Sequence, residues 1–232
     1  GVPSRAAAAM LGVPAGTVVV AGGHDQGCGA LGAGVLAEGV ALDATGTVEA
    51  IAPTRRRPVL TRAMLDAALF WDCHVVPDSY LGIAANFGGG CVLRWFRDTL
   101  AADVKRRAEA EGCDAYEMLL PEGEWQPSPV LVLPHLPGNF SPWCDSQSKG
   151  AILGLTLGTT QMDIALGIVE SITYEARLII DTIEAAGMPL HELRATGGAT
   201  KERRWLQLKA DVTGKRVAVP DVTEAACLGA AM

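Results

Sequence analysis

The chain has 232 residues, of which 49% are hydrophobic and 19% charged, and its 19 basic and 26 acidic side chains give a formal net charge of −7. So much apolar surface excludes a disordered protein, because its burial offsets the entropy lost on ordering. The acidic balance excludes a general nucleic-acid binder, since a phosphate backbone is bound by clustered Lys and Arg. Three short basic runs, at residues 55–57, 105–107 and 201–204, are interpreted as solvated loop or helix faces.

An uncharged stretch at residues 6–24 has about the length that a membrane helix needs, but glycines and a proline interrupt it. We interpret it as helix, loop and buried strand, and we expect no membrane partner. No basic segment precedes an apolar run near Gly1, so no secretory signal is expected. The six cysteines show no metal-ligand spacing. We therefore expect no metal site, and reduced, mostly buried thiols that favour the cytoplasm.

The elements begin with a helix at residues 5–11, where the Ser4 hydroxyl can accept from free N–H groups of the first turn. The β-branched run at residues 17–21 predicts a strand buried on both faces. A glycine pair then delivers Asp25 to the end of this strand, and the small residues at 27–36 predict a closely packed helix. The result is a strand, turn and helix unit with a carboxylate at the turn.

Two strand pairs follow. Residues 40–44 and 48–52 predict two strands on either side of the small turn Gly46-Thr47. Residues 68–76 and 80–86 predict a second pair around a proline-containing turn. These pairs predict an antiparallel part of a sheet.

Helices dominate the next part of the chain. Residues 92–100 and 102–111 predict helices, and residues 131–133 predict a short strand before a proline-rich loop at 134–142. That loop is too long to be a simple connection. Residues 160–186 predict the longest helix, because its apolar residues recur every three or four positions and share one face. They are Ile164, Ile168, Ile172, Ala176, Ile179 and Ile183.

The last part alternates strand and helix: strands at residues 193–196 and 217–219, and helices at 201–212 and from 223 onward. Strand pairs followed by alternation predict an α/β fold with a mixed sheet and helices on both of its faces. The lone residues His135 and His191 are interpreted as polar surface or loop residues.

Three glycine-containing turns, at residues 22–26, 44–47 and 196–199, are candidate phosphate sites. Glycine lets backbone N–H groups approach a ligand, and a helix N-terminus adds partial positive charge. Each turn taken singly is also explained as an ordinary tight turn. Neither a Walker-type phosphate loop nor a dinucleotide-binding glycine motif is present.

Several motifs occur in a fixed order along the chain, and together they resemble the FGGY carbohydrate kinases. The resemblance implies two actin-like (ribonuclease H-like) lobes that clamp a sugar or sugar alcohol and ATP and transfer the γ-phosphoryl group to a substrate hydroxyl. The motifs are Ala21-Gly22-Gly23-His24-Asp25-Gln26, Gly46-Thr47, Gly90 before residues 93–98, residues 150–155 leading to Asp163 and Glu170, Gly197-Gly198, and residues 205–214 and 224–231.

By this resemblance, residues 1–37 are the end of the first lobe and residues 38–232 are most of the second, nucleotide-binding lobe. We expect the chain to be a fragment that lacks the phosphate loop of the first lobe and is inactive alone. The resemblance cannot name the sugar, because specificity lies mainly in the other lobe. The alternative function is a non-catalytic actin-like module that binds nucleotide or partner proteins.

The resemblance also assigns roles to residues. Asp25 is the expected catalytic base, with an N-cap aspartate as the alternative. His24 and Gln26 are expected beside it in the substrate site, with a packing role preferred for His24. The expected ATP-binding residues are Gly46, Thr47, Gly90, Arg94, Gly197, Gly198 and Glu202.

Within that set, Gly46 and Thr47 are expected near the terminal phosphates and Gly198 near adenosine. Glu202 is divided equally between a ligand contact and a first-turn helix acid. ATP and Mg²⁺ are the expected cofactors, and Mg²⁺ would bridge phosphate oxygens. The expected partners are the sugar or polyol and ATP, with a homodimer as a possibility.

Overall fold

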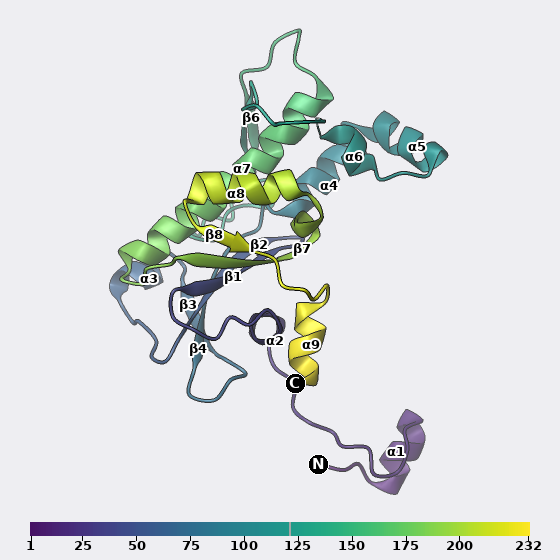
Figure 1. Ribbon diagram of the computed structural model, residues 1–232, viewed down its shortest axis with the longest axis vertical. Coiled ribbons are helices and arrows are strands. Elements are labelled where there is room, and N and C mark those ends of the chain that lie inside the picture. The colour runs from purple at the N-terminus through teal and green to yellow at the C-terminus, as the bar shows by residue number, and fades with distance from the viewer. Residues whose placement is uncertain (121) are drawn as a thin grey trace.

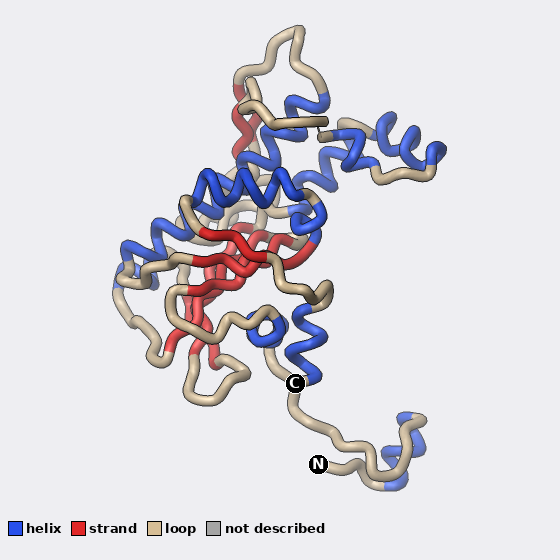
Figure 2. The backbone as a smooth tube through the Cα atoms, in the orientation of Figure 1, coloured by secondary structure: helices blue, strands red, loops and turns tan. Residues whose placement is uncertain are grey.

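A computed structural model of the chain describes residues 1–120 and 122–232. Six strands form a mixed sheet in the order β3-β4-β2-β1-β7-β8, and helices cover both of its faces (Figures 1 and 2). The predicted α/β class with a mixed sheet is confirmed. The strands are β1 (Val40–Thr45), β2 (Glu49–Arg55), β3 (Phe70–Cys73), β4 (Tyr80–Asn86), β7 (Glu192–Gly197) and β8 (Arg216–Ala218).

The strand pairs that the sequence predicted are antiparallel, and the later strands join β1 in parallel. β1 pairs with β2 so that Thr45 lies opposite Glu49, and the turn between them is Gly46-Thr47-Val48. β1 also pairs in parallel with β7, where Thr45 lies opposite Gly197. Parallel neighbours end at the same edge, so the turn after β1 and the turn after β7 meet at one end of the sheet.

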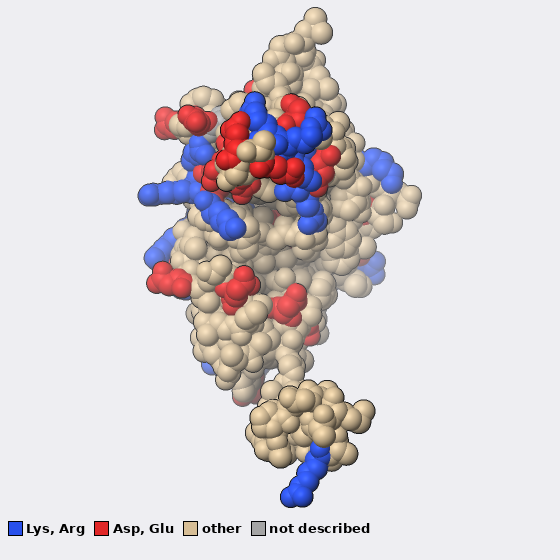
Figure 3. Space-filling model, turned by 90° about the vertical axis from the view of Figure 1, so that its right-hand side faces the viewer, with Lys and Arg blue, Asp and Glu red and all other residues tan. Residues whose placement is uncertain are grey.

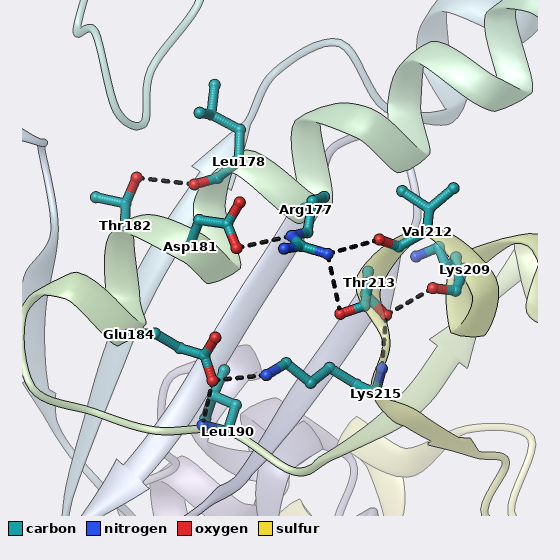
Figure 4. Close-up of polar contacts among 10 residues, drawn as sticks. All are labelled: Arg177, Leu178, Asp181, Thr182, Glu184, Leu190, Lys209, Val212, Thr213 and Lys215. Atoms are coloured by element: carbon teal, nitrogen blue, oxygen red, sulfur yellow. Dashed lines mark hydrogen bonds and ion pairs between the residues drawn. The ribbon is translucent and has the colours of Figure 1, made fainter.

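One face of the sheet is covered by the long helix α7 (Gln161–Ala185) and by α8 (Arg203–Thr213). Thr160 and Asp163 form a capping box at the start of α7, which satisfies two backbone N–H groups reciprocally. The predicted apolar stripe is confirmed: five of its six members are buried, and Ile164 is half-buried. Polar contacts also join the two helices, as when the Arg177 guanidinium donates to the Val212 carbonyl at 2.8 Å (Figure 4).

The other face is covered by α2 (Asp25–Gly32) and α9 (Ala225–Ala231). These two helices touch through their backbones. A Cβ added to Gly32 would overlap the carbonyl of Ala225, and one added to Gly229 would overlap the carbonyl of Cys28. Small residues allow this close approach, as the sequence predicted for α2, although the helix is shorter than expected.

A second group of elements extends beyond the sheet and packs on the N-terminal half of α7. Its own core contains Phe96, Leu119 and Ile168, all buried. On the side of the molecule that faces right in Figure 1, acidic and basic side chains are interspersed over the upper part (Figure 3). The elements are α4 (Gly90–Thr99), α5 (Ala102–Glu111), α6 (Ala115–Leu119), β5 (Leu131–Leu133) and β6 (Ala151–Leu153).

The structure corrects several expectations. Helix α1 (Arg5–Leu11) forms with Ser4 as its cap, but residues 17–21 are not a strand. Val18 and Val20 are exposed, and in the described part of the chain the backbone of Val19 pairs only with Gly1. A β-branched run becomes a strand only where a neighbouring strand accepts its hydrogen bonds.

Three short elements were not predicted: α3 (Arg62–Asp66), α6 and β6. The predicted helix at residues 201–212 begins instead with the 3₁₀ turn η1 (Gly198–Lys201), and α8 follows it. None of the described helices has the length and hydropathy needed to cross a bilayer.

The structure also corrects the expected exposure of His135 and of the cysteine thiols. His135 lies in a loop but is buried, where Nδ1 is 2.7 Å from Ser148 Oγ and Nε2 is 3.0 Å from Glu175 Oε1. Of the six cysteines, all within the described ranges, Cys28 alone is buried, and four are exposed. His191 is an exposed loop residue, as expected.

Candidate functional site

A cavity of about 380 Å³ lies at the edge of the sheet where β1 and β7 end. Six of the seven predicted ATP-binding residues line it, although they come from segments far apart in the sequence. They are Gly46, Thr47, Gly90, Arg94, Gly198 and Glu202. The seventh, Gly197, precedes Gly198 and lines an adjoining cavity.

The turn Gly46-Thr47 forms one wall, and the N-terminus of α4 holds it in place. The N–H of Gly90 donates to the Gly46 carbonyl at 2.9 Å, and that of Cys91 donates to the Thr47 carbonyl at 3.1 Å. The N–H groups of Gly46 and Gly90 are therefore both used inside the protein, because Gly46 donates to Val48. Within the described residues, the N–H and hydroxyl of Thr47 have no partner, so Thr47 offers the free donors of this wall.

Gly197 and Gly198 are adjacent at the end of β7, and the absence of a side chain matters for a different reason at each. Gly197 has φ +88°, and a Cβ there would overlap the Thr45 carbonyl, because β7 runs directly beside β1. Gly198 has ordinary backbone angles, and a Cβ there would meet no heavy atom within 4 Å. The missing side chain of Gly198 thus leaves open space on the cavity side.

The charged residues of this cavity differ in whether they already have hydrogen-bond or ion-pair partners within the described protein. Arg94 on α4 is exposed and pairs with no acidic side chain of the described chain, so its guanidinium is available to an anion. Glu202 caps α8: it accepts from the Arg204 backbone at 2.9 Å and from the Arg204 guanidinium at 2.8 and 2.7 Å. These hydrogen bonds lower the pKa of Glu202. Glu202 is thus the N-cap residue of α8 rather than a first-turn acid, and its contact with a ligand stays a prediction.

A larger cavity of about 700 Å³ adjoins the first, and Gly198 and Lys201 line both. Asp25 and Gln26 line this larger cavity from the start of α2. The Asp25 side chain is 76% exposed and accepts from the Gln26 N–H at 2.8 Å. The amide oxygen of Gln26 is buried and has no partner among the described residues, so it is free to accept from a ligand.

His24 was expected to pack, and that expectation is wrong. Its side chain is half exposed, and it lies 3.4 Å from an oxygen of Asp25 and 3.8 Å from one of Asp72. It is the N-cap residue of α2 but makes no capping hydrogen bond, and Asp25 is the first helical residue rather than the cap. Asp25 is therefore not the N-cap aspartate of the alternative explanation.

A buried charged cluster lies behind the Gly46-Thr47 turn, and sequence reasoning missed it. The Lys209 ammonium on α8 contacts both oxygens of Asp43 at 2.7 and 2.8 Å and Glu49 Oε1 at 2.5 Å. Burial and the nearby Asp43 charge raise the pKa of Glu49 to about 8, although Lys209 acts in the opposite direction. Burial alone would lower the pKa of Lys209, but the two carboxylates outweigh it and raise that pKa.

Other cavity residues were also missed. Lys201 was counted only as part of a solvated basic run, yet it borders both cavities and has no acidic partner among the described side chains. Tyr116 and Trp205 line the smaller cavity together with the acids Asp114 and Glu117. Tyr116 belongs to the short helix α6 that was not predicted, so no periodic signal pointed to it.

The smaller cavity offers open space at Gly198, a free hydroxyl and N–H at Thr47, and cations without acidic partners among the described residues at Arg94 and Lys201. Cations and free N–H groups are what phosphate oxygens require. In the described chain, no group of three His, Cys, Asp or Glu side chains is arranged to hold a metal ion.

Comparison with known proteins places the chain among sugar kinases. Residues 45–232 match the C-terminal domain of the FGGY family of carbohydrate kinases. A xylulose kinase of Staphylococcus epidermidis is 30% identical over 222 residues, which cover 96% of this chain and 43% of that protein. A glycerol kinase of Variovorax paradoxus is 37% identical over 150 residues, 62% of this chain and 29% of the relative. The chain thus spans less than half the length of these relatives.

Solved structures agree on the fold. The xylulose kinase of Rhodospirillum rubrum aligns with a TM-score of 0.75 at 25% identity, covering 100% of this chain and 45% of that one. A ligand-bound xylulose kinase of Lactobacillus acidophilus aligns with a TM-score of 0.79 at 22% identity, covering 98% and 44%. The expected actin-like lobe is confirmed by this likeness together with the family match.

Proposed function

The chain belongs to the FGGY family of carbohydrate kinases, and from this membership we propose that it supplies the nucleotide-binding lobe and the general base for ATP-dependent phosphorylation of a sugar or sugar-alcohol hydroxyl. One observation carries the proposal. Residues expected to contact ATP, drawn from segments between Gly46 and Glu202, line a single cavity, and the expected base lies in the cavity that adjoins it.

In this proposal the nucleotide lies across the smaller cavity. Adenosine occupies the open space beside Gly198, and the phosphates lie toward Thr47, whose hydroxyl and N–H are free donors. Arg94 and Lys201 supply positive charge for the phosphate oxygens. Mg²⁺ would be bound through the phosphates of the nucleotide and would supply neutralisation of their charge.

The base acts from the larger cavity. Asp25 accepts the proton of the attacking hydroxyl, which is the positioned acceptor that phosphoryl transfer requires. The unpartnered amide oxygen of Gln26 accepts a hydrogen bond from a second substrate hydroxyl. His24, half exposed beside Asp25, is a further donor to the substrate.

We also propose the division expected from the sequence, with residues 1–37 as the end of a first lobe and residues 38–232 as the second. Helix α2 belongs to residues 1–37, but it packs on the sheet that residues 38–232 form. The exposed thiols of Cys73, Cys113, Cys144 and Cys227 support a reducing compartment such as the cytoplasm.

The proposal is tested by two measurements on the 232-residue chain. Titration with a fluorescent ATP analogue is expected to show saturable binding that unlabelled ATP displaces. Release of ADP with a panel of pentoses, hexoses and polyols is expected to stay at background, because in-line transfer needs both lobes and a closed, water-poor site. Failure to bind ATP would refute the nucleotide-binding role, and sugar-stimulated release of ADP would refute the two-lobe argument.

A further inference from the structure

The proposed mechanism makes no use of the buried cluster around Lys209, although the ammonium of this lysine has an acceptor for each of its N–H groups. The Lys209 side chain is 1% exposed, and its ammonium meets three acceptor groups: the Asp43 carboxylate, Glu49 Oε1 and the Thr45 hydroxyl at 2.7 Å. An ammonium has three N–H donors, so each donor has one acceptor group. All three ammonium donors are thus used at zero exposure of Asp43 and Glu49, which holds Lys209 in one geometry, and Glu49 Oε2 is the cluster's one oxygen without a partner among the described residues.

The position of the cluster relates it to the cavity. Asp43 and Thr45 are two residues apart on β1, so their side chains share a face of the sheet. Glu49 begins β2 directly opposite Thr45 and presents its side chain on that same face. Lys209 therefore bridges the last residue before the turn Gly46-Thr47-Val48 and the first residue after it.

The cluster is also close to charge balance. Three ionised groups would leave one net negative charge in a buried space, which is costly. Burial and the Asp43 charge raise the pKa of Glu49 and so favour its protonated form, in which the ammonium and the Asp43 carboxylate balance. Loss of Lys209 would leave Asp43 uncompensated and would leave the two ends of the turn joined by the backbone pairing of β1 and β2 without a side-chain bridge.

We propose that Lys209 is a positioning residue for phosphate binding: its ammonium clamps Thr45 to Glu49 and thereby fixes the turn that presents Thr47 to the cavity. The inference rests on the proposed function, since it assigns the phosphates to that turn. Lys209 does not line either cavity and does not touch the nucleotide.

The test compares ATP with adenosine, because only ATP uses the turn. Lys209→Met is expected to weaken ATP binding by about 10- to 100-fold, by analogy with the cost of removing a residue that orients a metal ligand. Adenosine binding is expected to be unchanged. The double variant Asp43→Asn, Lys209→Met removes the charge imbalance as well as the clamp. It is expected to show the same selective loss even if the single variant does not fold.

Lys215→Met is the matched control. Lys215 also forms a lysine–carboxylate pair, with Glu184 at 2.6 Å (Figure 4), but it follows the C-terminal end of α8 and lines neither cavity. Its ATP and adenosine affinities are expected to equal those of the parent. Equal losses for ATP and adenosine in the Lys209 variants, or no loss, would overturn the positioning role alone. A parent chain that binds neither ligand would overturn the proposed function and this inference with it.

Discussion

The N–H of Gly90 donates to the carbonyl oxygen of Gly46 at 2.9 Å, so the first turn of α4 and the β1–β2 turn are held together by backbone alone. A Cβ on Gly90 would lie 2.5 Å from that same oxygen, a distance that real Cβ atoms do not adopt. One of the two segments must therefore shift when Gly90 is replaced.

Gly90→Ala is expected to lower the free energy of unfolding by about 1–3 kcal/mol, the usual cost of overpacking, and also to weaken ATP binding. Chemical denaturation and nucleotide titration check the two effects. Gly158→Ala is the control, because a Cβ there makes only an ordinary 3.8 Å contact. Parent-like stability and affinity for Gly90→Ala would show that the turn is not fixed by this contact.

Gly198→Val is expected to act on binding without acting on folding. Its Cβ enters open space, so the fold is retained, but the branched side chain fills volume that adenosine needs. Affinity for a fluorescent ATP analogue should fall by about tenfold or more, with the melting temperature close to that of the parent. Gly158→Val serves as the control. Equal ATP affinity in Gly198→Val and the parent would place adenosine elsewhere.

Asp25→Asn in the complete kinase is expected to reduce kcat by about 10²- to 10⁴-fold, because the amide lacks the basic lone pair. Sugar affinity and melting temperature should change little, since the Asp25 side chain is 76% exposed and its polar contacts within the described structure are with its neighbours His24 and Gln26. Steady-state kinetics and thermal melting separate these effects.

Asp72→Asn is the matched control for Asp25, as it removes a second, 44% exposed carboxylate that also faces His24. Its kcat is expected to remain near that of the parent. A near-normal kcat for Asp25→Asn, or an equal fall in Asp72→Asn, would remove Asp25 from the role of base.

Glu49 is expected to make stability depend on pH. Burial first, and the Asp43 charge second, raise its folded pKa from 4.5 to about 8 against the opposing effect of Lys209. Between these values the folded protein holds a proton that the unfolded chain has lost, so the contribution of Glu49 to the free energy of unfolding is greatest below pH 4.5 and falls as pH rises toward 8. The limiting slope for one proton is about 1.4 kcal/mol per pH unit.

Glu49→Gln keeps an acceptor for Lys209 but cannot titrate, so its stability should be flatter over this window. Urea denaturation between pH 5 and about 8 checks the prediction. The exposed residue Glu109 provides the control as Glu109→Gln, which should retain the parent slope. Identical slopes in Glu49→Gln and the parent would show that Glu49 is ionised throughout.

Periodic patterns predicted the long elements and their faces well. The helix at residues 160–186 and the strand at 80–86 have bounds within a residue of those expected, because regular alternation or helical spacing reports which side is buried. The cavity could be assembled from the sequence only through the ordered motifs, since distance along the chain says nothing of how Gly46, Gly90 and Gly198 converge.

What the sequence could not predict depends on tertiary partners. Residues 17–21 have strand propensity but no neighbouring strand, and so remain extended and exposed. Lys209 lies in an amphipathic helix where a lysine is normally solvated, and its burial follows from Asp43 and Glu49, which are far away in the chain. Pattern alone cannot pair an acid on a strand with a base 160 residues later.

The backbone contact between Gly32 and α9 has a mechanical consequence. The backbones of α2 and α9 are in direct contact at Gly32 and Gly229, so we expect the two helices to move together on the sheet. Asp25 is the first residue of α2, whereas residues 13–24 form no helix or strand that would pack on α2. Movement of the chain before residue 24 is therefore expected to leave Asp25 in the lining of the cavity that it shares with Gly198, so that the proposed base keeps its place relative to the proposed nucleotide site.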